Sequence, residues 1–370
     1  MIKLQVSSNE NFVVLGLGRS GMTSARALNA SGANVICWDD DPEKRSLASS
    51  QGLRVIGSVS DFDWESIDRL IISPGVPHHF PLPHPIVSAA VSAGVLIDND
   101  VGLFFQSIAT KSWDKFSVRP RIVAVTGSNG KSTTASLLHH IFLKLGYKSQ
   151  LAGNIGRGVL DIDPPENNEI IVLELSSYQI EVARILSPDL AIFTNFSADH
   201  LERHGGIGGY LAAKRRLFTE GCPDYSIIGV DELAGLNLAQ QLSASIGDES
   251  IIRVSATKQM RRFDWSIFLD AGYLVEHRKG KQINSTDLKV FDNFVGPHSY
   301  QNAASAYAAC RALGMSPRKI VEAMKGFDGL AHRSQKIAAV NGITFINDSK
   351  ATNVESAMMS LSAYKNIRWI

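Results

Sequence analysis

The residues best suited to chemistry lie in a glycine-rich loop, Thr126-Gly-Ser-Asn-Gly-Lys-Ser-Thr133. In such loops backbone N–H groups surround phosphate oxygens, a lysine (here Lys131) neutralises the β- and γ-phosphates, and the next hydroxyl ligates magnesium. An apolar run, Arg121–Val125, precedes the loop, and an amphipathic segment reaching about Leu145 follows it. This order predicts a strand, a phosphate loop and a helix, and therefore nucleoside triphosphate binding. A glycine turn beside a surface lysine is the alternative.

Three acidic or imidazole groups follow two predicted strands and are candidate metal ligands. Glu174 follows the strand-like run Ile170–Leu173, and Asp199-His200 follows Leu190–Thr194. A carboxylate beside a phosphate loop suits Mg²⁺, which takes few protein ligands and keeps its waters. A histidine at a strand end is usually structural, so the sequence leaves both a structural and a metal-binding role open for His200.

A second glycine-rich turn, Gly16-Leu-Gly18-Arg-Ser-Gly21, follows the predicted strand Phe12–Leu15 and opens a predicted helix that runs to Ala30. Such a turn brings backbone N–H groups close to a diphosphate. Asp39 ends the next predicted strand, Asn34–Trp38, where a carboxylate normally receives ribose hydroxyls. Taken alone, this pattern is typical of a nicotinamide-dependent oxidoreductase. Glycines that serve packing alone are the other interpretation.

A further loop, Ser73-Pro-Gly-Val76, follows the predicted strand Leu70–Ile72. Loops at the carboxyl ends of neighbouring parallel strands form a ligand crevice, so this loop is expected beside the first glycine turn. His78, His79 and His84 follow in a proline-rich segment and are expected to be solvated.

Composition narrows the class of protein. The 370 residues carry a net charge of +1, which offers no basic excess for a nucleic-acid backbone. No apolar run approaches the roughly 20 residues that span a bilayer. The cysteines are three and far apart, without the spacing of a disulfide framework or a zinc site. We therefore expect a soluble cytoplasmic protein with no nucleic-acid or membrane partner.

The phosphate loop also departs from the usual pattern, because Val125 stands where an earlier glycine is common. This shorter form resembles the loop of the Mur ligases and the folylpolyglutamate synthetases. Further segments resemble the Mur ligases in their order along the chain: Leu151–Gly156, Leu173–Gln179, Asn195–Leu201 and Tyr210–Lys214. Mur ligases are ADP-forming amide ligases that build the peptide stem of peptidoglycan.

The resemblance implies an ATP site with two Mg²⁺ ions. The residues implied for ATP are Gly127, Ser128, Asn129, Gly130, Lys131, Ser132, Thr133, Asn302, Arg333 and Asp348. Those implied for metal are Ser132, Glu174, His200 and Lys214, and those implied for catalysis are Lys131, His200 and Lys214. By composition Lys214 is simply part of a cationic helix face; in the family the lysine at this place is carbamylated and becomes an anionic metal ligand. Ser299 replaces a family asparagine in the segment Gly296–Asn302, so a role for Ser299 at adenine stays open.

The string Asn347-Asp-Ser-Lys-Ala-Thr-Asn353 resembles the branch of the family that adds D-glutamate. The implied partners are UDP-N-acetylmuramoyl-L-alanine, D-glutamate and ATP. The protein is expected to be a monomer. The residues implied for substrate binding are Gly18, Arg19, Ser20, Asp39, Ser73, Gly75, Asn154, Ser176, Gln179, Lys350 and Thr352.

We expect an α/β protein of three parts. Residues 1–99 would form a Rossmann-like domain that binds the UDP precursor, residues 100–329 a P-loop ATPase domain, and residues 330–370 an incomplete Rossmann-like domain. The last part is expected to hold one strand (Ile337–Ile346), one helix (Val354–Ser362) and the opening of a strand (Ile367–Ile370), whereas a self-standing domain needs on the order of 100 residues. A truncated chain is the favoured explanation and a degenerate protein the alternative. Such a chain would bind the UDP precursor and, weakly, ATP without completing ligation. A non-catalytic UDP-sugar-binding or regulatory protein is the remaining hypothesis.

Overall fold

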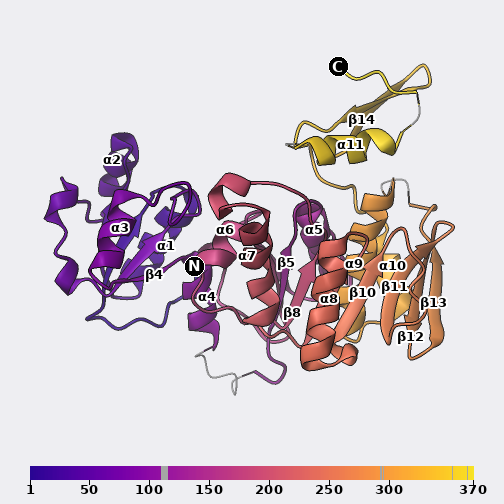
Figure 1. The fold of residues 1–370 in the computed structure, drawn as a ribbon, viewed down its shortest axis with the longest axis horizontal. Coiled ribbons are helices and arrows are strands. Elements are labelled where there is room, and N and C mark those ends of the chain that lie inside the picture. Colours follow the sequence, from indigo (N-terminus) through magenta and orange to yellow (C-terminus); the bar gives the residue numbers. More distant parts are fainter. Residues whose placement is uncertain (110–115, 292–293, 295, 352, 365) are drawn as a thin grey trace.

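The computed structural model describes residues 1–370 except 110–115, 292–293, 295, 352 and 365. Two parallel-strand layers and a small hairpin follow one another along the chain (Figure 1). The α/β fold class predicted from the sequence is confirmed. Within the described residues no helix has the length and apolar character needed to cross a bilayer.

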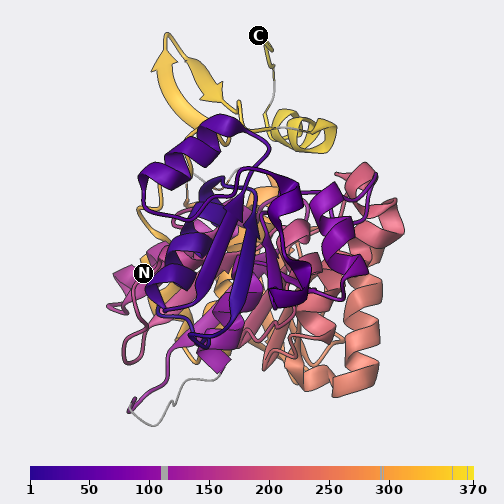
Figure 2. The ribbon, with the colours of Figure 1, turned by 90° about the vertical axis from the view of Figure 1, so that its left-hand side faces the viewer.

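The first layer is a four-stranded parallel sheet in the order β2-β1-β3-β4. Its apolar strands are buried because helices cover them, and Figure 2 shows this sheet facing the viewer. The strands are β1 (Asn11–Leu15), β2 (Asn34–Trp38), β3 (Arg69–Ile72) and β4 (Leu96–Asp98), and the helices are α1 (Arg19–Ala30), α2 (Pro42–Ser50) and α3 (Pro85–Ser92). The sequence predicted the first three strands and α1.

The second layer is a nine-stranded sheet in the order β13-β12-β11-β10-β9-β8-β5-β7-β6. Strands β5 to β11 run parallel to their neighbours, and β12 and β13 add an antiparallel edge. The strands are β5 (Arg121–Thr126), β6 (Ser149–Gly153), β7 (Ile170–Glu174), β8 (Leu190–Phe193), β9 (Tyr225–Gly229), β10 (Ile251–Ser255), β11 (Trp265–Asp270), β12 (Tyr273–Arg278) and β13 (Lys281–Asp287).

Helices cover both faces of this sheet, so its inner strands are apolar along their whole length. One hydrophobic cluster joins the sheet to α5 (Lys131–Lys144), α9 (Pro297–Ala312) and α10 (Pro317–Met324). Another joins its other face to α7 (Ile207–Thr219) and α8 (Leu233–Ile246) and continues into the first layer. Helix α4 (Asp100–Ala109) joins the two layers, and α6 (Ser177–Val182) follows β7. The sheet therefore holds the carboxyl ends of β5, β7 and β8 at one edge.

The last segment folds differently from the prediction. The expected single strand Ile337–Ile346 is a hairpin of β14 (Gln335–Val340) and β15 (Ile343–Asn347). Asn341 and Gly342 both have positive φ, 51° and 78°, and an Asn-Gly pair of this kind reverses an antiparallel ribbon. Helix α11 (Val354–Ser362) is as predicted. The predicted opening of a strand at Ile367–Ile370 is wrong, since this segment pairs with none of the described strands.

Candidate active site

The phosphate loop lies between β5 and α5 and needs glycine at two positions. Gly130 has φ of +80°, and a Cβ there would lie 2.1 Å from Asn302 Oδ1. A Cβ on Gly127 would lie 2.0 Å from Thr194 Oγ1, again with positive φ. The loop is fixed from the next strand, since the Asn129 backbone N–H donates to Asn195 Oδ1 at 2.8 Å. The backbone therefore packs against β8 and α9 more closely than any side chain allows.

Lys131 points back over its own loop. Its amine donates to the carbonyl oxygens of Gly127 (3.1 Å) and Ser128 (2.8 Å). Desolvation by the surrounding protein lowers the pKa of Lys131, while the negative charge of Glu174 works in the opposite direction. The amine is thus held at the centre of the loop, where a triphosphate would replace the two carbonyl contacts.

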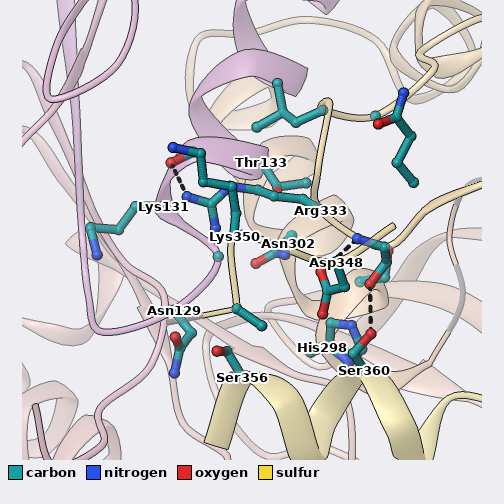
Figure 3. A pocket seen from close by; sticks show the side chains of 18 of the residues that line it. Asn129, Lys131, Thr133, His298, Asn302, Arg333, Asp348, Lys350, Ser356 and Ser360 are labelled. Atoms are coloured by element: carbon teal, nitrogen blue, oxygen red, sulfur yellow. Dashed lines mark hydrogen bonds between the residues drawn. The ribbon is translucent and has the colours of Figure 1, made fainter. Parts of the chain in front are cut away.

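A cavity of about 600 Å³ opens over this loop. The hairpin segment and α11 face it from the other side, so that Arg333 and Lys350 line the same cavity as Lys131 (Figure 3). The cavity brings together these predicted residues: Ser128, Asn129, Gly130, Lys131, Ser132, Thr133, Asn154, Glu174, His200, Asn302, Arg333, Asp348 and Lys350. Ser299 also lines it, next to His298.

Glu174 ends β7 at the floor of the cavity. Its Oε1 accepts a hydrogen bond from Asn154 Nδ2 at 3.0 Å, and its Oε2 is buried without a hydrogen-bond partner. A buried carboxylate oxygen without a donor is costly, and a cation satisfies it. The residues present therefore fit a magnesium ion that also takes the Ser132 hydroxyl and phosphate oxygens. The described residues contain no cluster of three or more His, Cys, Asp or Glu arranged for a metal, so protein carboxylates and imidazoles alone do not complete such a site.

His200 lies on the loop after β8, in a left-handed conformation with φ of 52°. Its Nε2 is 3.5 Å from Asp199 Oδ2, and its ring is 5.2 Å from that of Tyr178. Desolvation lowers the pKa of His200, which favours the neutral imidazole that binds metals. Asp199 also lines the cavity.

Lys214 is the most unusual charged group in the site. It is 1% exposed on α7, its amine donates to the Gly127 carbonyl at 2.7 Å, and it lies 4.4 Å from the centre of the Tyr210 ring. Burial lowers the pKa of Lys214 well below its usual value, and the nearby positive charge of Lys131 lowers it further. The lysine that composition alone assigns to a solvated face is therefore buried behind the phosphate loop.

The segment after α10 supplies three predicted residues. Arg333 Nη2 donates to Ser132 Oγ at 3.1 Å, which joins this segment to the phosphate loop. Asp348 Oδ1 accepts from the Ser334 backbone N–H at 2.7 Å, and Lys350 follows in the same turn. Thr352 lies outside the described residues.

The two loops at the carboxyl ends of β1 and β3 lie side by side, and the carboxylate that ends the β2 strand contacts the first of them. A Cβ on Gly21 would lie 1.7 Å from the Gly16 carbonyl oxygen, so helix and turn touch through glycine. Ser73 Oγ donates to the same carbonyl at 2.7 Å, which puts the loop containing Gly75 beside the turn containing Gly18. Asp39 is already engaged, since its Oδ2 accepts from the Leu17 N–H at 2.6 Å.

Several predicted substrate residues lie where the two sheets meet. The Arg19 guanidinium donates to the carbonyls of Gly153 (3.1 Å) and Asn154 (3.3 Å), across from the first glycine turn. Ser176 and Gln179 form a capping box at the start of α6. Ser20 and Gln179 face the carboxyl of Asp100, whose pKa is raised by burial. These groups therefore lie between the first sheet and the central sheet.

Sequence reasoning missed some residues and misplaced one. Tyr210, which touches Ser128 Oγ at 3.2 Å, and Asn353, whose amide lies 3.3 Å from Asn129 Oδ1, both contact the phosphate loop. Both stood inside motifs quoted for the family resemblance, so a signal existed. His78 was expected to be solvated but is 8% exposed, because its loop packs against α6. The sequence contained no sign of that contact.

Comparison with known proteins shows the family of the chain. The Mur ligase middle domain family matches residues 125–310. Two solved structures share the fold: UDP-N-acetylmuramate:L-alanyl-gamma-D-glutamyl-meso-diaminopimelate ligase from Neisseria meningitides (17% identity, TM-score 0.54, covering 87% of this chain and 99% of that one) and MurF from Acinetobacter baumannii (18% identity, TM-score 0.54, covering 98% and 71%). The fold and the phosphate-loop site define a Mur ligase.

Curated relatives narrow the class. UDP-N-acetylmuramoylalanine–D-glutamate ligase from Cereibacter sphaeroides strain ATCC 17025 is 54% identical over 370 residues, which cover the whole of this chain and 80% of the relative. The protein of the same name from Ruegeria pomeroyi is also 54% identical, with 100% and 79% covered. The chain belongs to the UDP-N-acetylmuramoylalanine–D-glutamate ligase family.

Proposed function

We propose that this chain uses ATP to join D-glutamate to UDP-N-acetylmuramoyl-L-alanine, with ADP and phosphate as the other products. The observation that carries the proposal is the shared cavity, in which the loop of Lys131 faces Glu174, His200 and Arg333. The positive side chains of Lys131 and Arg333 complement a triphosphate and an acceptor carboxylate there, and the carboxylate of Glu174 complements a metal ion. The relatives of the same name support this choice among the Mur ligases.

The three parts of the chain have separate functions in this proposal. Residues 1–99 hold the uridine diphosphate on the turn Gly18–Gly21, with Ser73 and Gly75 beside it. Residues 100–329 hold ATP and the reacting carboxylate, and residues 330–370 supply groups that close over both. Asn154, Ser176 and Gln179 lie toward the muramoyl-alanine end, and Lys350 and Thr352 are assigned to the incoming D-glutamate.

The reaction begins when an oxygen of the alanine carboxylate attacks the γ-phosphorus of ATP and ADP leaves, which forms an acyl phosphate. The D-glutamate amine then attacks the acyl carbon, phosphate leaves with the C–O bond electrons, and the amine loses a proton. Lys131 and Arg333 hold triphosphate oxygens in line for the first step, since phosphoryl transfer depends mainly on positioning and charge neutralisation. Magnesium, when bound, supplies additional positive charge to the phosphates.

Ser132, Glu174, His200 and Lys214 are assigned to two magnesium ions. The lowered pKa of Lys214 supports carbamylation, because a neutral amine adds to CO₂ with loss of a proton and gives an anionic carbamate. Such an anion would also remove the repulsion between Lys214 and Lys131. We further propose that the protein acts as a cytoplasmic monomer, where its nucleotide substrates are present.

Calorimetric titration separates this proposal from its alternatives. UDP-N-acetylmuramoyl-L-alanine and a non-hydrolysable ATP analogue with Mg²⁺ should each bind with 1:1 stoichiometry, and NAD⁺ should not bind. Binding of NAD⁺ in place of the UDP precursor would favour the oxidoreductase hypothesis. Phosphate release that requires both the UDP precursor and D-glutamate, but not L-glutamate, then tests the ligation itself. Binding of both ligands without that release would limit the chain to the binding steps.

A further inference from the structure

An arginine from the central part of the chain contacts the loop Pro74–Phe80, which follows Ser73. Arg203 belongs to the short 3₁₀ helix Leu201–His204, which follows His200 directly. Its Nη1 donates to the Phe80 carbonyl at 3.0 Å, and its Nη2 donates to the carbonyls of Val76 (2.9 Å) and Pro74 (3.3 Å). A planar guanidinium spreads five N–H groups over three nitrogens and can therefore reach separate carbonyls, whereas an ammonium group has its three donors on one atom.

The same guanidinium also lies near an aromatic ring that contacts His200. It lies 5.1 Å from the centre of the Tyr178 ring, and that ring lies 5.2 Å from the ring of His200. A continuous set of contacts therefore runs from the Pro74–Phe80 loop of the first sheet, through Arg203 and Tyr178, to His200.

A second group of side chains lies between the same two elements. His78 Nε2 lies 3.7 Å from Glu181 Oε2 on α6, and that oxygen lies 2.9 Å from His204 Nδ1. His204 Nε2 in turn lies 2.9 Å from Ser177 Oγ, and the His204 ring stacks on Tyr178. The 3₁₀ helix and the start of α6 thus form one surface against which the loop is seated.

We propose that Arg203 is a positioning residue that couples occupancy of the first-sheet crevice to occupancy of the nucleotide site. This inference rests on the proposed function. Arg203 fixes the backbone of the loop that lines the crevice, and its helix is covalently continuous with the loop of Asp199 and His200. A ligand that orders either loop therefore orders the other, and the ordering cost is met once instead of twice.

The experiment is a pair of titrations on the full chain. The dissociation constant of UDP-N-acetylmuramoyl-L-alanine is measured with and without a saturating non-hydrolysable ATP analogue and Mg²⁺. In the unaltered chain the analogue should tighten binding by at least about 5-fold. Arg203→Ala and Arg203→Lys should reduce that factor to below about 2-fold, while the affinity for the analogue alone stays the same. A role in stability alone would not change this ratio.

Arg278→Lys is the matched control, because Arg278 also lies over an aromatic ring, that of Trp265, but on β12 of the central sheet. It should retain the full coupling factor. Thermal unfolding checks that each variant folds, and Arg203→Lys keeps the charge and most of the volume. Full coupling in Arg203→Ala, or two ligands that bind the unaltered chain independently, would overturn the inference and leave the proposed function standing. Failure of the unaltered chain to bind the UDP precursor would overturn both.

Discussion

Replacing Lys131 by alanine should separate the two ligands that the chain is proposed to bind. The amine contacts two carbonyls of its own loop, at 3.1 and 2.8 Å, and lies at the floor of the nucleotide cavity. Hydrogen bonds to charged groups contribute roughly 1.5–3 kcal/mol each, so two phosphate oxygens would give about 3–6 kcal/mol. The amine already has two acceptors before nucleotide binds, so the lower limit applies. We expect affinity for the ATP analogue to fall by about 100-fold.

Affinity of the same variant for UDP-N-acetylmuramoyl-L-alanine, titrated without nucleotide, should change by less than about 3-fold, under 1 kcal/mol. The residues assigned to that ligand's diphosphate, Gly18 to Gly21, lie on the first sheet and make no hydrogen bond to Lys131 in the described chain. Lys144→Ala, at the exposed far end of the same helix, is the control and should leave both affinities unchanged. A parallel loss of both ligands in Lys131→Ala would refute the assignment of separate sites.

Two further predictions concern stability. Gly21→Ala puts a Cβ 1.7 Å from the Gly16 carbonyl oxygen and should destabilise the fold by about 1–3 kcal/mol. Gly208→Ala lies on α7 with open space around it and should stabilise the fold by about 0.4–1 kcal/mol. Equal denaturant midpoints for the two variants would contradict the packing argument. Burial lowers the pKa of His78 from 6.5 to about 4, so the unfolded chain takes up a proton first as pH falls. Stability present above pH 6.5 should therefore decline by about 3 kcal/mol toward pH 4 and then level off. His78→Gln should remove this decline. The quantity to measure is the difference in unfolding free energy between the two proteins at each pH, because Asp98, whose pKa burial raises to about 6, contributes equally to both. A difference that does not vary with pH would show that His78 does not titrate as its burial requires.

The sequence predicted those parts of the site that depend on strand ends. Glu174 and the phosphate loop follow neighbouring parallel strands, so their proximity follows from the topology alone. The sequence did not predict which group each polar side chain contacts. Asp39 has the position of a ribose ligand, yet its carboxylate accepts the Leu17 N–H, a contact that depends on the turn's final geometry. His78 looked solvated because nothing local indicated that α6 would cover it.

The prediction of one strand in place of the β14–β15 hairpin was wrong for a different reason. The run from Ile337 to Ile346 is apolar enough for one strand, and the prediction of a single strand leaves the Asn341-Gly342 pair within it unused. Asn-Gly is a strong reversal signal because both residues tolerate positive φ at low cost. Turn chemistry should have taken precedence over the apolar pattern here.

The arrangement of the first sheet also bears on the choice between a nicotinamide and a UDP precursor. The glycine turn recognises a diphosphate and does not distinguish the two. A dinucleotide, however, lies across two mononucleotide-binding halves of one six-stranded sheet. The described sheet here has four strands in the order β2-β1-β3-β4, which is not that six-stranded arrangement. Arg19 of the same turn reaches the Gly153 and Asn154 carbonyls beside Glu174. A ligand that leaves this turn is therefore directed toward the phosphate cavity, which suits a diphosphate whose far end must meet ATP.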